Sequence, residues 1–368
     1  MFQLSRVGNK PVLQPDKNIF WETEGVFNAG VTEFEGKNGK EILMLYRAVG
    51  EKDAYVSHFG LATSKDGITF ERVTDKPVFG PSKPYDLWAT EDPRITKIED
   101  EYYITYVAVA DRIMDHGRSI EREIPLETRT ALLKTKDFLT YEHLGIITPP
   151  GADDKDTVLF PKKIPCIDPS GNMRMRYGML HRPHRWSKDW LHGPFAAKVP
   201  IELPFTIDDM PQKPSVWIAW SDDLIHWDMH TPLMKPAQVS AAKNGPGLPP
   251  IETPDGWLVI YHHVTEDPLT KRLTYTARAA LFELENPTKY VGKLAYNILS
   301  PEVSFETEHG AAIVFPTGGF VKDDILYVYY GCSDTYIALA TGSLSELIAE
   351  LKKAGPPAPV TTIAPIIR

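Results

Sequence analysis

The chain has 368 residues, of which 42% are hydrophobic and 11% aromatic, and it carries a formal net charge of -9. This length can bury a large core, and the negative charge disfavours nucleic acid as a partner, because nucleic-acid binding needs a basic face. No stretch is long and apolar enough to span a membrane, and Met1 to Pro11 contain no apolar signal core, so a cytoplasmic protein is expected. Cys166 and Cys332 lack metal-ligand spacing, so we expect them to be buried or incidental.

A pair of short strands recurs along the chain, and this repeat predicts the fold. The first strand of each pair, aromatic and β-branched, is expected at 42–46, 102–107, 175–180, 257–261 and 325–330. The second is expected at 59–63, 130–133, 216–220, 277–281 and 336–340. Each unit is about the size of one four-stranded sheet, so we predict an all-β fold: a single five-bladed β-propeller domain over residues 1–368.

In the first three units, the second strand ends in the same turn. An Asp follows two places after a hydroxyl residue, at Asp66, Asp137 and Asp223, and an aromatic residue follows four places later. This pattern suits a tight turn closed by side-chain to backbone hydrogen bonds.

Helical periodicity is weak except near the C-terminus. Between Ser343 and Lys353, Leu344, Leu347, Ile348 and Leu351 fall on one face, which predicts a short helix. The Gly- and Pro-rich tail at 355–359 cannot continue that helix and is expected to be extended.

Polar residues gather where the inner strands of the predicted blades begin or end. They occur at 27–30, 46–48, 90–94, 159–162, 180–183, 242–247, 261–263, 315–316 and 331–335. In a propeller these ends converge on one opening, here called the mouth. Buried ionisable groups at such positions are unfavourable unless they have a use, so a functional site is expected there.

Several of these segments resemble, in order, the motifs of glycoside hydrolase family 130. They are EDPR at 91–94, VLFPKKI at 158–164, MLHRP at 179–183, KNGPGLPPI at 243–251 and SDT at 333–335. The resemblance runs from about Asn28 to about Leu347. That family comprises β-mannoside phosphorylases and a smaller set of β-1,2-mannosidases, built on a five-bladed propeller.

The resemblance implies that Asp92 is the only catalytic acid and that its proton reaches the glycosidic oxygen through the 3-hydroxyl of the mannosyl residue. Such a carboxyl group must stay protonated near neutrality, which desolvation and the neighbouring Glu91 would favour. The alternative is that Asp92 only caps a turn before Pro93.

Other motif positions imply the binding residues. The resemblance assigns phosphate binding to Arg129, Arg182, Lys243 and His262, whose charges suit a dianion. Taken singly, each has an ordinary structural reading: a solvated strand end, a partner for a nearby Asp, a surface lysine and a satisfied core histidine, respectively. Asn28, Arg47 and Asp334 match positions that grip the mannosyl unit, and the substrate-binding set is completed by Glu91, Arg94 and His181.

The implied reaction is an inverting phosphorolysis, in which phosphate attacks the anomeric carbon and α-mannose 1-phosphate is released. The expected partners are a β-mannooligosaccharide and phosphate, with no metal or organic cofactor. The pattern is closer to the β-1,2-mannobiose and β-1,2-oligomannan branch than to the mannosylglucose branch, so β-1,2 linkages are favoured over β-1,4.

Two other functions stay open. An inverting β-mannosidase needs a second carboxylate about 6.5 to 9.5 Å from the acid, for which Glu252 and Glu91 are the candidates. A non-catalytic glycan-binding propeller would instead carry aromatic platforms, such as Trp21, Trp88, Trp186 or Trp190, around the mouth.

Two insertions and the oligomeric state also stay open. The segment 184–213, rich in Trp, His and Pro, is expected either to overhang the mouth or to form a subunit contact. The charged segment 112–128 is expected to be a lid or an interface. The sequence leaves a homo-oligomer open.

Overall fold

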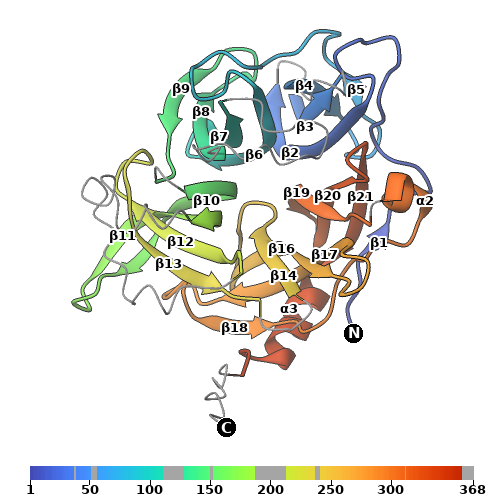
Figure 1. The fold of residues 1–368 in the computed structure, drawn as a ribbon. Helices are drawn as coiled ribbons and strands as arrows, with labels where there is room; N and C mark the ends of the chain where they lie inside the picture. Colours follow the sequence, from blue (N-terminus) through green and yellow to red (C-terminus); the bar gives the residue numbers. More distant parts are fainter. Residues whose placement is uncertain are drawn as a thin grey trace.

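The computed structural model describes residues 1–36, 39–50, 56–110, 128–149, 152–186, 213–236, 241–310 and 312–358. Its strands form five antiparallel sheets arranged as a ring, with β2, β6, β10, β14 and β19 toward the centre (Figure 1). This arrangement confirms the predicted five-bladed β-propeller. The two insertions named above fall almost wholly outside the described residues, so the predictions for them stay untested.

In blades 1 to 4 the main strands follow in chain order from the centre outward. Blade 1 consists of β2 (Gly25–Gly36), β3 (Gly39–Val49), β4 (Ser57–Ser64) and β5 (Glu71–Arg72). Blade 2 consists of β6 (Ala89–Ile98), β7 (Glu101–Val109), β8 (Thr128–Thr135) and β9 (Glu142–Ile146). Blade 3 consists of β10 (Ala152–Ile167), β11 (Met173–Trp186), β12 (Val216–Ser221) and β13 (Trp227–Met234).

Blade 4 consists of β14 (Ala241–Pro246), β16 (Gly256–Glu266), β17 (Leu273–Phe282) and β18 (Tyr290–Lys293), and the short β15 (Ile251–Thr253) also pairs with β16. Blade 5 consists of β19 (Phe315–Lys322), β20 (Ile325–Cys332), β21 (Tyr336–Ser343) and β1 (Ser5–Arg6). The outermost strand of the last blade thus comes from the start of the chain, which closes the ring by joining its two ends.

The helices are few and short among the described residues. The helical turns α2 (Ser304–Thr307) and η2 (Glu308–Gly310) precede β19, and α3 (Leu344–Ala354) follows β21 and packs beside β18. Ser343 caps α3 by accepting a hydrogen bond from the backbone of Glu346 at 3.2 Å. This helix confirms the prediction, and Leu347, Ile348 and Leu351 on its predicted apolar face are buried. The chain is non-helical from 355 to 358, as expected of this tail.

The repeated strand pair turns out to be the second and third strands of every blade, as in β3 and β4 or β20 and β21. The turn after the third strand is also confirmed in blades 1 to 3. In the first, Asp66 accepts hydrogen bonds from the backbone of Ile68 and Thr69 at 2.8 Å, while Ser64 accepts one from Gly67. These backbone hydrogen bonds lower the pKa of Asp66 to about 2.

The sequence predicts all the polar positions of the mouth on the inner strands, and the structure corrects this for four of them. Arg47, Arg182, His262 and the segment before Ser333 lie on β3, β11, β16 and β20, one strand out from the centre. They still reach the mouth, because these strands pair antiparallel with the inner strands and their ends meet the same rim.

A bulge interrupts every inner strand near the mouth. Pairing shifts register between Phe27 and Gly30, Glu91 and Arg94, and Lys155 and Val158, and similar shifts occur in β14 and β19. The first three bulges hold Asn28, Asp92 and Asp156 at positive φ, values of 50°, 52° and 61°. Asn and Asp tolerate this left-handed conformation better than other side-chain-bearing residues. In blades 1 to 3 the bulge therefore turns one polar side chain away from the regular strand alternation.

The core is divided into apolar clusters between neighbouring blades, built from the alternating inward residues of the second and third strands. Both cysteines are buried and free, as expected. Among the described helices, none has the length and apolar character needed to cross a membrane.

Candidate active site

Asp92 is held at the mouth by two residues of blade 1. Asn28 Nδ2 donates to Asp92 Oδ1 at 2.9 Å, and Arg47 Nη1 donates to the same oxygen at 3.0 Å. All three side chains are buried. Gly331 packs directly against the Asn28 side chain. A Cβ at position 331 would overlap Asn28 Oδ1, so a glycine there leaves room for this position of Asn28. The alternative reading of Asp92 as a simple turn cap therefore fails, since its carboxylate is bonded across two blades.

Glu91 lies beside Asp92 but is strongly paired itself. Arg47 Nη2 donates to Glu91 Oε1 at 2.7 Å, and Lys155 Nζ lies 3.6 Å from Glu91 Oε2. Burial opposes ionisation of Glu91, yet Arg47 and Lys155 outweigh it and hold its pKa below the ordinary value. Glu91 was expected to favour the protonated form of Asp92 by its negative charge. Arg47 and Lys155 lie against the Glu91 carboxylate and offset that charge.

Asp156, on the bulge of β10, is the centre of a second cluster. Arg182 Nε donates to Asp156 Oδ2 at 2.5 Å, Arg94 Nη2 to Asp156 Oδ1 at 3.3 Å, and His262 Nε2 lies 3.5 Å from Oδ2. Burial opposes ionisation of Asp156, but the charges of Arg182 and Arg94 hold its pKa well below the ordinary value. Arg182 thus does partner an Asp, and its role in phosphate binding stays a prediction.

Arg94 differs from its predicted role in substrate binding. Its Nε donates to the carbonyl oxygen of Gly247 at 2.8 Å, its Nη1 to that of Asp92 at 3.4 Å, and its Nη2 to Asp156. The side chain is 1% exposed and lies over the ring of Phe315. All three nitrogens are occupied by protein acceptors, so this geometry favours an internal brace between blades 2, 3 and 4 over a sugar contact.

Lys243 is not a surface lysine. It lies on β14 with Nζ 4.9 Å from the centre of the Tyr275 ring. Burial and the nearby Arg182 lower the pKa of Lys243 to about 7, so near neutrality its charge depends on what binds beside it. An anion at this position would favour the charged form.

Asp334 and Tyr275 have pKa values that charges of both clusters shift. Desolvation by the surrounding walls raises the pKa of Asp334, although the residue is exposed to solvent; Arg47 and Lys243 act against this, while Asp92 and Glu91 add to it. Burial raises the pKa of Tyr275 to about 12; the charge of Arg182 acts against this, and those of Asp334, Asp156 and Asp92 add to it. The direct link between the clusters is Arg94, which donates to both Asp92 and Asp156.

His262 is fully buried, and within the described residues neither ring nitrogen has a hydrogen-bond partner. It is therefore not the satisfied core histidine of the ordinary reading. Burial lowers its pKa well below the usual value, so the ring is neutral near pH 7. Gly245 lies opposite His262 on the neighbouring strand, and any Cβ there would overlap the His262 ring.

Arg129, the fourth residue predicted to bind phosphate, lies on β8 and donates to the carbonyl oxygen of Thr148.

His181 has both ring nitrogens engaged inside blade 3. Its Nδ1 lies 2.6 Å from Asp154 Oδ2, and its Nε2 lies 3.1 Å from His230 Nδ1. Because the ring is 1% exposed and bonded on both sides, the geometry favours a structural role for His181 over the predicted contact with substrate.

The residues proposed for the alternative functions lie elsewhere. Glu252 is exposed on β15 and pairs with Lys162 at 2.7 Å, which disfavours it as a base for water at the mouth. Trp21 is buried, stacks on Tyr46 and donates to the Asp75 carbonyl oxygen, so it is not a platform for sugar. Trp88 packs against an apolar cluster with Ala89. The Trp186 side chain and Trp190 fall outside what the structure describes.

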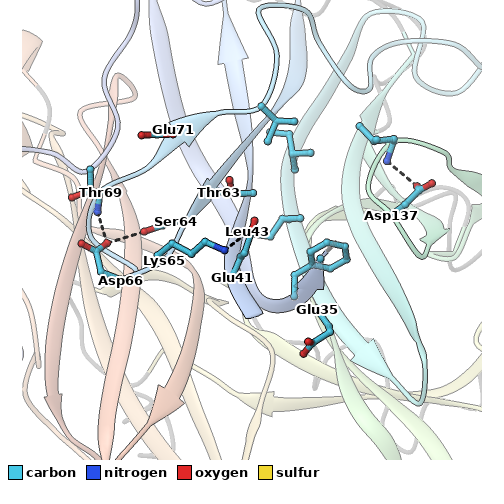
Figure 2. A pocket seen from close by; sticks show the side chains of 15 residues that line it. Glu35, Glu41, Leu43, Thr63, Ser64, Lys65, Asp66, Thr69, Glu71 and Asp137 are labelled. Carbon is cyan, nitrogen blue, oxygen red and sulfur yellow. Dashed lines mark hydrogen bonds and ion pairs between the residues drawn. The ribbon is translucent and has the colours of Figure 1, made fainter. Parts of the chain in front are cut away.

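The large cavity shown in Figure 2 is not at the mouth. It has a volume of about 840 Å³ and lies at the end of blade 1 away from Asn28, beside a turn of blade 2, lined by Glu35, Glu41, Lys65 and Asp137 among others. Its polar residues belong largely to the turns described above, for example Asp66 with Ser64 and Thr69. It contains none of the predicted site residues.

Sequence reasoning missed three residues of the mouth: Asp156, Lys155 and Tyr275. Asp156 sits in a run of acids with Asp153 and Asp154, directly before the expected inner strand of blade 3. Asp156 could have been recognised by its position, because it is a polar residue near the start of an inner strand, as Asn28 and Asp92 are. Nothing in the sequence distinguished Tyr275 from the other strand tyrosines.

The fold and the site together define a β-propeller that joins a carboxylate to a group of cations at its mouth. The family model for glycoside hydrolase family 130, described as beta-1,4-mannooligosaccharide phosphorylase, matches residues 9–353. The chain belongs to this family.

Individual relatives agree with this assignment. The chain is 33% identical to a 1,2-beta-oligomannan phosphorylase of Thermoanaerobacter sp., over 94% of this chain and 99% of that protein. It is 25% identical to a beta-1,4-mannooligosaccharide phosphorylase of Ruminococcus albus, over 90% of this chain and 86% of that protein. Among solved structures, it is similar to the beta-1,2-mannobiose phosphorylase of Listeria innocua in complex with beta-1,2-mannobiose, with a TM-score of 0.72, 25% identity, and coverage of 95% of this chain and 99% of that one.

Proposed function

We propose that this protein is an inverting β-mannoside phosphorylase that cleaves β-1,2-mannosyl linkages with inorganic phosphate and releases α-mannose 1-phosphate. The coarser statement, an enzyme that acts on mannosides, follows from membership of the family and from the names of its relatives.

One observation carries the proposal: the acid and the cations are neighbours. Arg94 donates to the carbonyl oxygen of Asp92 at 3.4 Å and to Asp156 Oδ1 at 3.3 Å. The other oxygen of Asp156 accepts from Arg182 Nε at 2.5 Å. A sugar bonded to Asp92 would therefore have the cations within reach of its anomeric carbon. Cations beside a sugar site suit an anionic nucleophile better than water, because they lower the energy of the phosphate dianion as it approaches.

The proposed reaction assigns a task to each group. Asp92 gives its proton, through the 3-hydroxyl of the mannosyl residue, to the leaving oxygen. Phosphate, held by Arg182, Lys243 and His262 with Arg129, attacks the anomeric carbon from the opposite face. A single displacement inverts the anomeric centre, so a β-mannoside gives the α-phosphate. Asn28, Arg47 and Asp334 would hold the mannosyl hydroxyls.

The linkage is proposed from the relatives. The Thermoanaerobacter and Listeria proteins are named for β-1,2-linked substrates, and the first has a higher identity to this chain than the β-1,4 phosphorylase of Ruminococcus albus has. We therefore favour β-1,2 linkages over β-1,4. Hydrolysis is not favoured, because Glu252 lies exposed in a surface ion pair and Glu91 is bonded to Arg47.

Incubation with β-1,2-mannobiose, with and without phosphate, tests the proposal. The expected result is α-mannose 1-phosphate and mannose in phosphate, and little turnover without it. β-1,4-Mannobiose in a parallel reaction tests the linkage, with slower turnover expected. Release of mannose at the same rate in phosphate-free buffer would replace the phosphorylase by the hydrolase.

A further inference from the structure

A second pocket lies along blade 4, next to the chain that leaves α3. Its volume is about 500 Å³. Its walls are the polar residues Lys235, Asn244, His263, Arg278 and Lys293, the rings of Tyr261 and Tyr296, and residues 354–358. We call it the outer pocket. It is separate from the mouth, because successive residues of a strand face opposite sides of the sheet: His262 lies beside Asp156, whereas His263 faces the outer pocket.

The outer pocket gathers positive charge without a matching negative charge. Its described lining contains Lys235, Arg278 and Lys293 but no Asp or Glu. None of these three forms an ion pair with an acidic residue within the described part of the chain. Arg278 Nε donates to Asn297 Oδ1 at 2.7 Å, and Lys293 Nζ lies 5.8 Å from the centre of the Tyr261 ring. Hydrogen bonds and rings hold these cations in place and leave their charge uncompensated.

The surroundings make this charge unfavourable in the empty pocket. Burial and the nearby Arg278 lower the pKa of Lys293 to about 8, and burial lowers that of Arg278. Cations that lie close together and partly shielded from water repel each other. A bound anion would remove that repulsion and would accept charge-assisted hydrogen bonds from both side chains.

His263 adds a second, independent observation. The residue is 3% exposed, and its Nδ1 lies 2.7 Å from Asn244 Oδ1. Its Nε2 has no hydrogen-bond partner among the described residues. A buried polar atom without a partner is unfavourable, so its presence in a pocket wall points to a ligand that supplies a hydroxyl group or a charge there.

We infer that the outer pocket binds a small phosphate monoester, with the phosphate between Arg278 and Lys293. The Arg fork suits two phosphate oxygens, and a lysine adds a point charge. Tyr261, Tyr296 and the prolines of the tail also line the pocket and offer apolar surface to the organic part. The volume falls within the range of about 300 to 1,000 Å³ that is usual for small-molecule sites.

Titration calorimetry with glucose 6-phosphate and with inorganic phosphate as probes tests this inference. The double variant Arg278→Gln, Lys293→Gln should bind glucose 6-phosphate at least about tenfold more weakly, since two charge-assisted hydrogen bonds are lost. Lys293→Arg and the exposed control Lys322→Gln should stay within about twofold of the wild type. Phosphorolysis by the double variant should also stay within twofold, which separates this site from the proposed function.

Two outcomes would overturn the inference: unchanged affinity in a folded double variant, or saturable binding of inorganic phosphate without binding of the monoester. Because the double variant can fail to fold, the wild-type protein supplies a second test. Pyridoxal 5′-phosphate carries a phosphate ester and an aldehyde, which condenses with a lysine amine to an imine and water, and added borohydride then reduces the imine to a stable amine. Peptide mapping should find the label on Lys293, with glucose 6-phosphate protecting it. Labelling of Lys293 no faster than of exposed Lys322 would contradict the inference.

Discussion

Asp156 Oδ2 accepts a hydrogen bond from Arg182 Nε at 2.5 Å, and this pair links the inner strand of blade 3 to a cation of the mouth. Both residues are buried, and Arg94 contacts the other oxygen of the same carboxylate. The carboxylate therefore balances two guanidinium groups that would otherwise repel each other. In the proposed reaction it would also orient the Arg182 side chain toward phosphate.

Asp156→Asn is expected to destabilise the protein by about 3 to 5 kcal/mol, because it leaves buried guanidinium groups uncompensated. Asn tolerates the positive φ of this position, so the backbone strain should not change. Urea denaturation measures the effect, with the exposed Glu252→Gln as the matched control. A loss below about 1 kcal/mol would contradict the balancing role.

The same variant should change the response to acid. The pKa of Asp156 is held well below its ordinary value, so its contribution to stability is present above the unfolded value of about 3.9 and is lost as the pH falls below it. Stability measured between pH 5 and 3 should therefore fall less steeply in Asp156→Asn than in the wild type.

Asp92→Asn should keep the fold and lower turnover by about a hundredfold to ten-thousandfold, because it removes the proposed proton source. Asn keeps an oxygen that can accept from Asn28 and Arg47 and tolerates the positive φ at this position. Initial rates of phosphorolysis give the effect, and thermal unfolding provides the control for folding. A variant with more than about a tenth of wild-type activity would move the acid to another residue.

Lys243→Met should raise the KM for phosphate at least about tenfold while the KM for β-1,2-mannobiose stays within a few-fold, since a charge-assisted hydrogen bond to phosphate is lost. Lys243→Arg keeps the charge and should show a smaller effect. An equal loss toward both substrates would count against a phosphate-binding role.

Lys243→Met should also stabilise the protein without ligand near pH 7, by about 1 to 2 kcal/mol. The pKa of Lys243 is lowered to about 7, while the unfolded value is about 10.4, so between these values the unfolded state binds more protons than the folded state. Wild-type stability should therefore gain from this residue as the pH rises from 7 to 10, and the variant should lack that gain. Denaturation at several pH values measures the difference.

Arg6→Ala should destabilise the closure of the ring by about 3 to 5 kcal/mol. Arg6 on β1 donates from Nε and Nη2 to the two oxygens of Glu306, both at 2.8 Å, and Glu306 is fully buried. Lys10→Ala, on an exposed residue of the same segment, should have little effect on the denaturation midpoint. Equal midpoints for the two variants would show that β1 does not contribute to closing the propeller.

Local chemistry explains what could be predicted. The pattern of each strand, the turns at Asp66, Asp137 and Asp223, and the helix after Ser343 each depend on residues within a few positions of one another. Their periodicity and side-chain to backbone bonds can be recognised along the chain. The motif residues at the strand ends were recognisable for the same reason, and Asn28, Arg47, Glu91 and Asp92 do lie together.

By itself, the sequence determined the number of blades, the strand pairs within them and the family, because repeated local patterns specify these. Only the tertiary structure decided which polar residues meet. The bulge of β10 places Asp156, and not Asp153, between Arg94 and Arg182, and residues 62 and 26 positions away from it in the sequence supply its partners. The tertiary structure also decided that Arg94 contacts the carbonyl oxygen of Gly247 and that His181 contacts Asp154. Such contacts depend on the closing of the ring, which brings together segments that no local pattern relates.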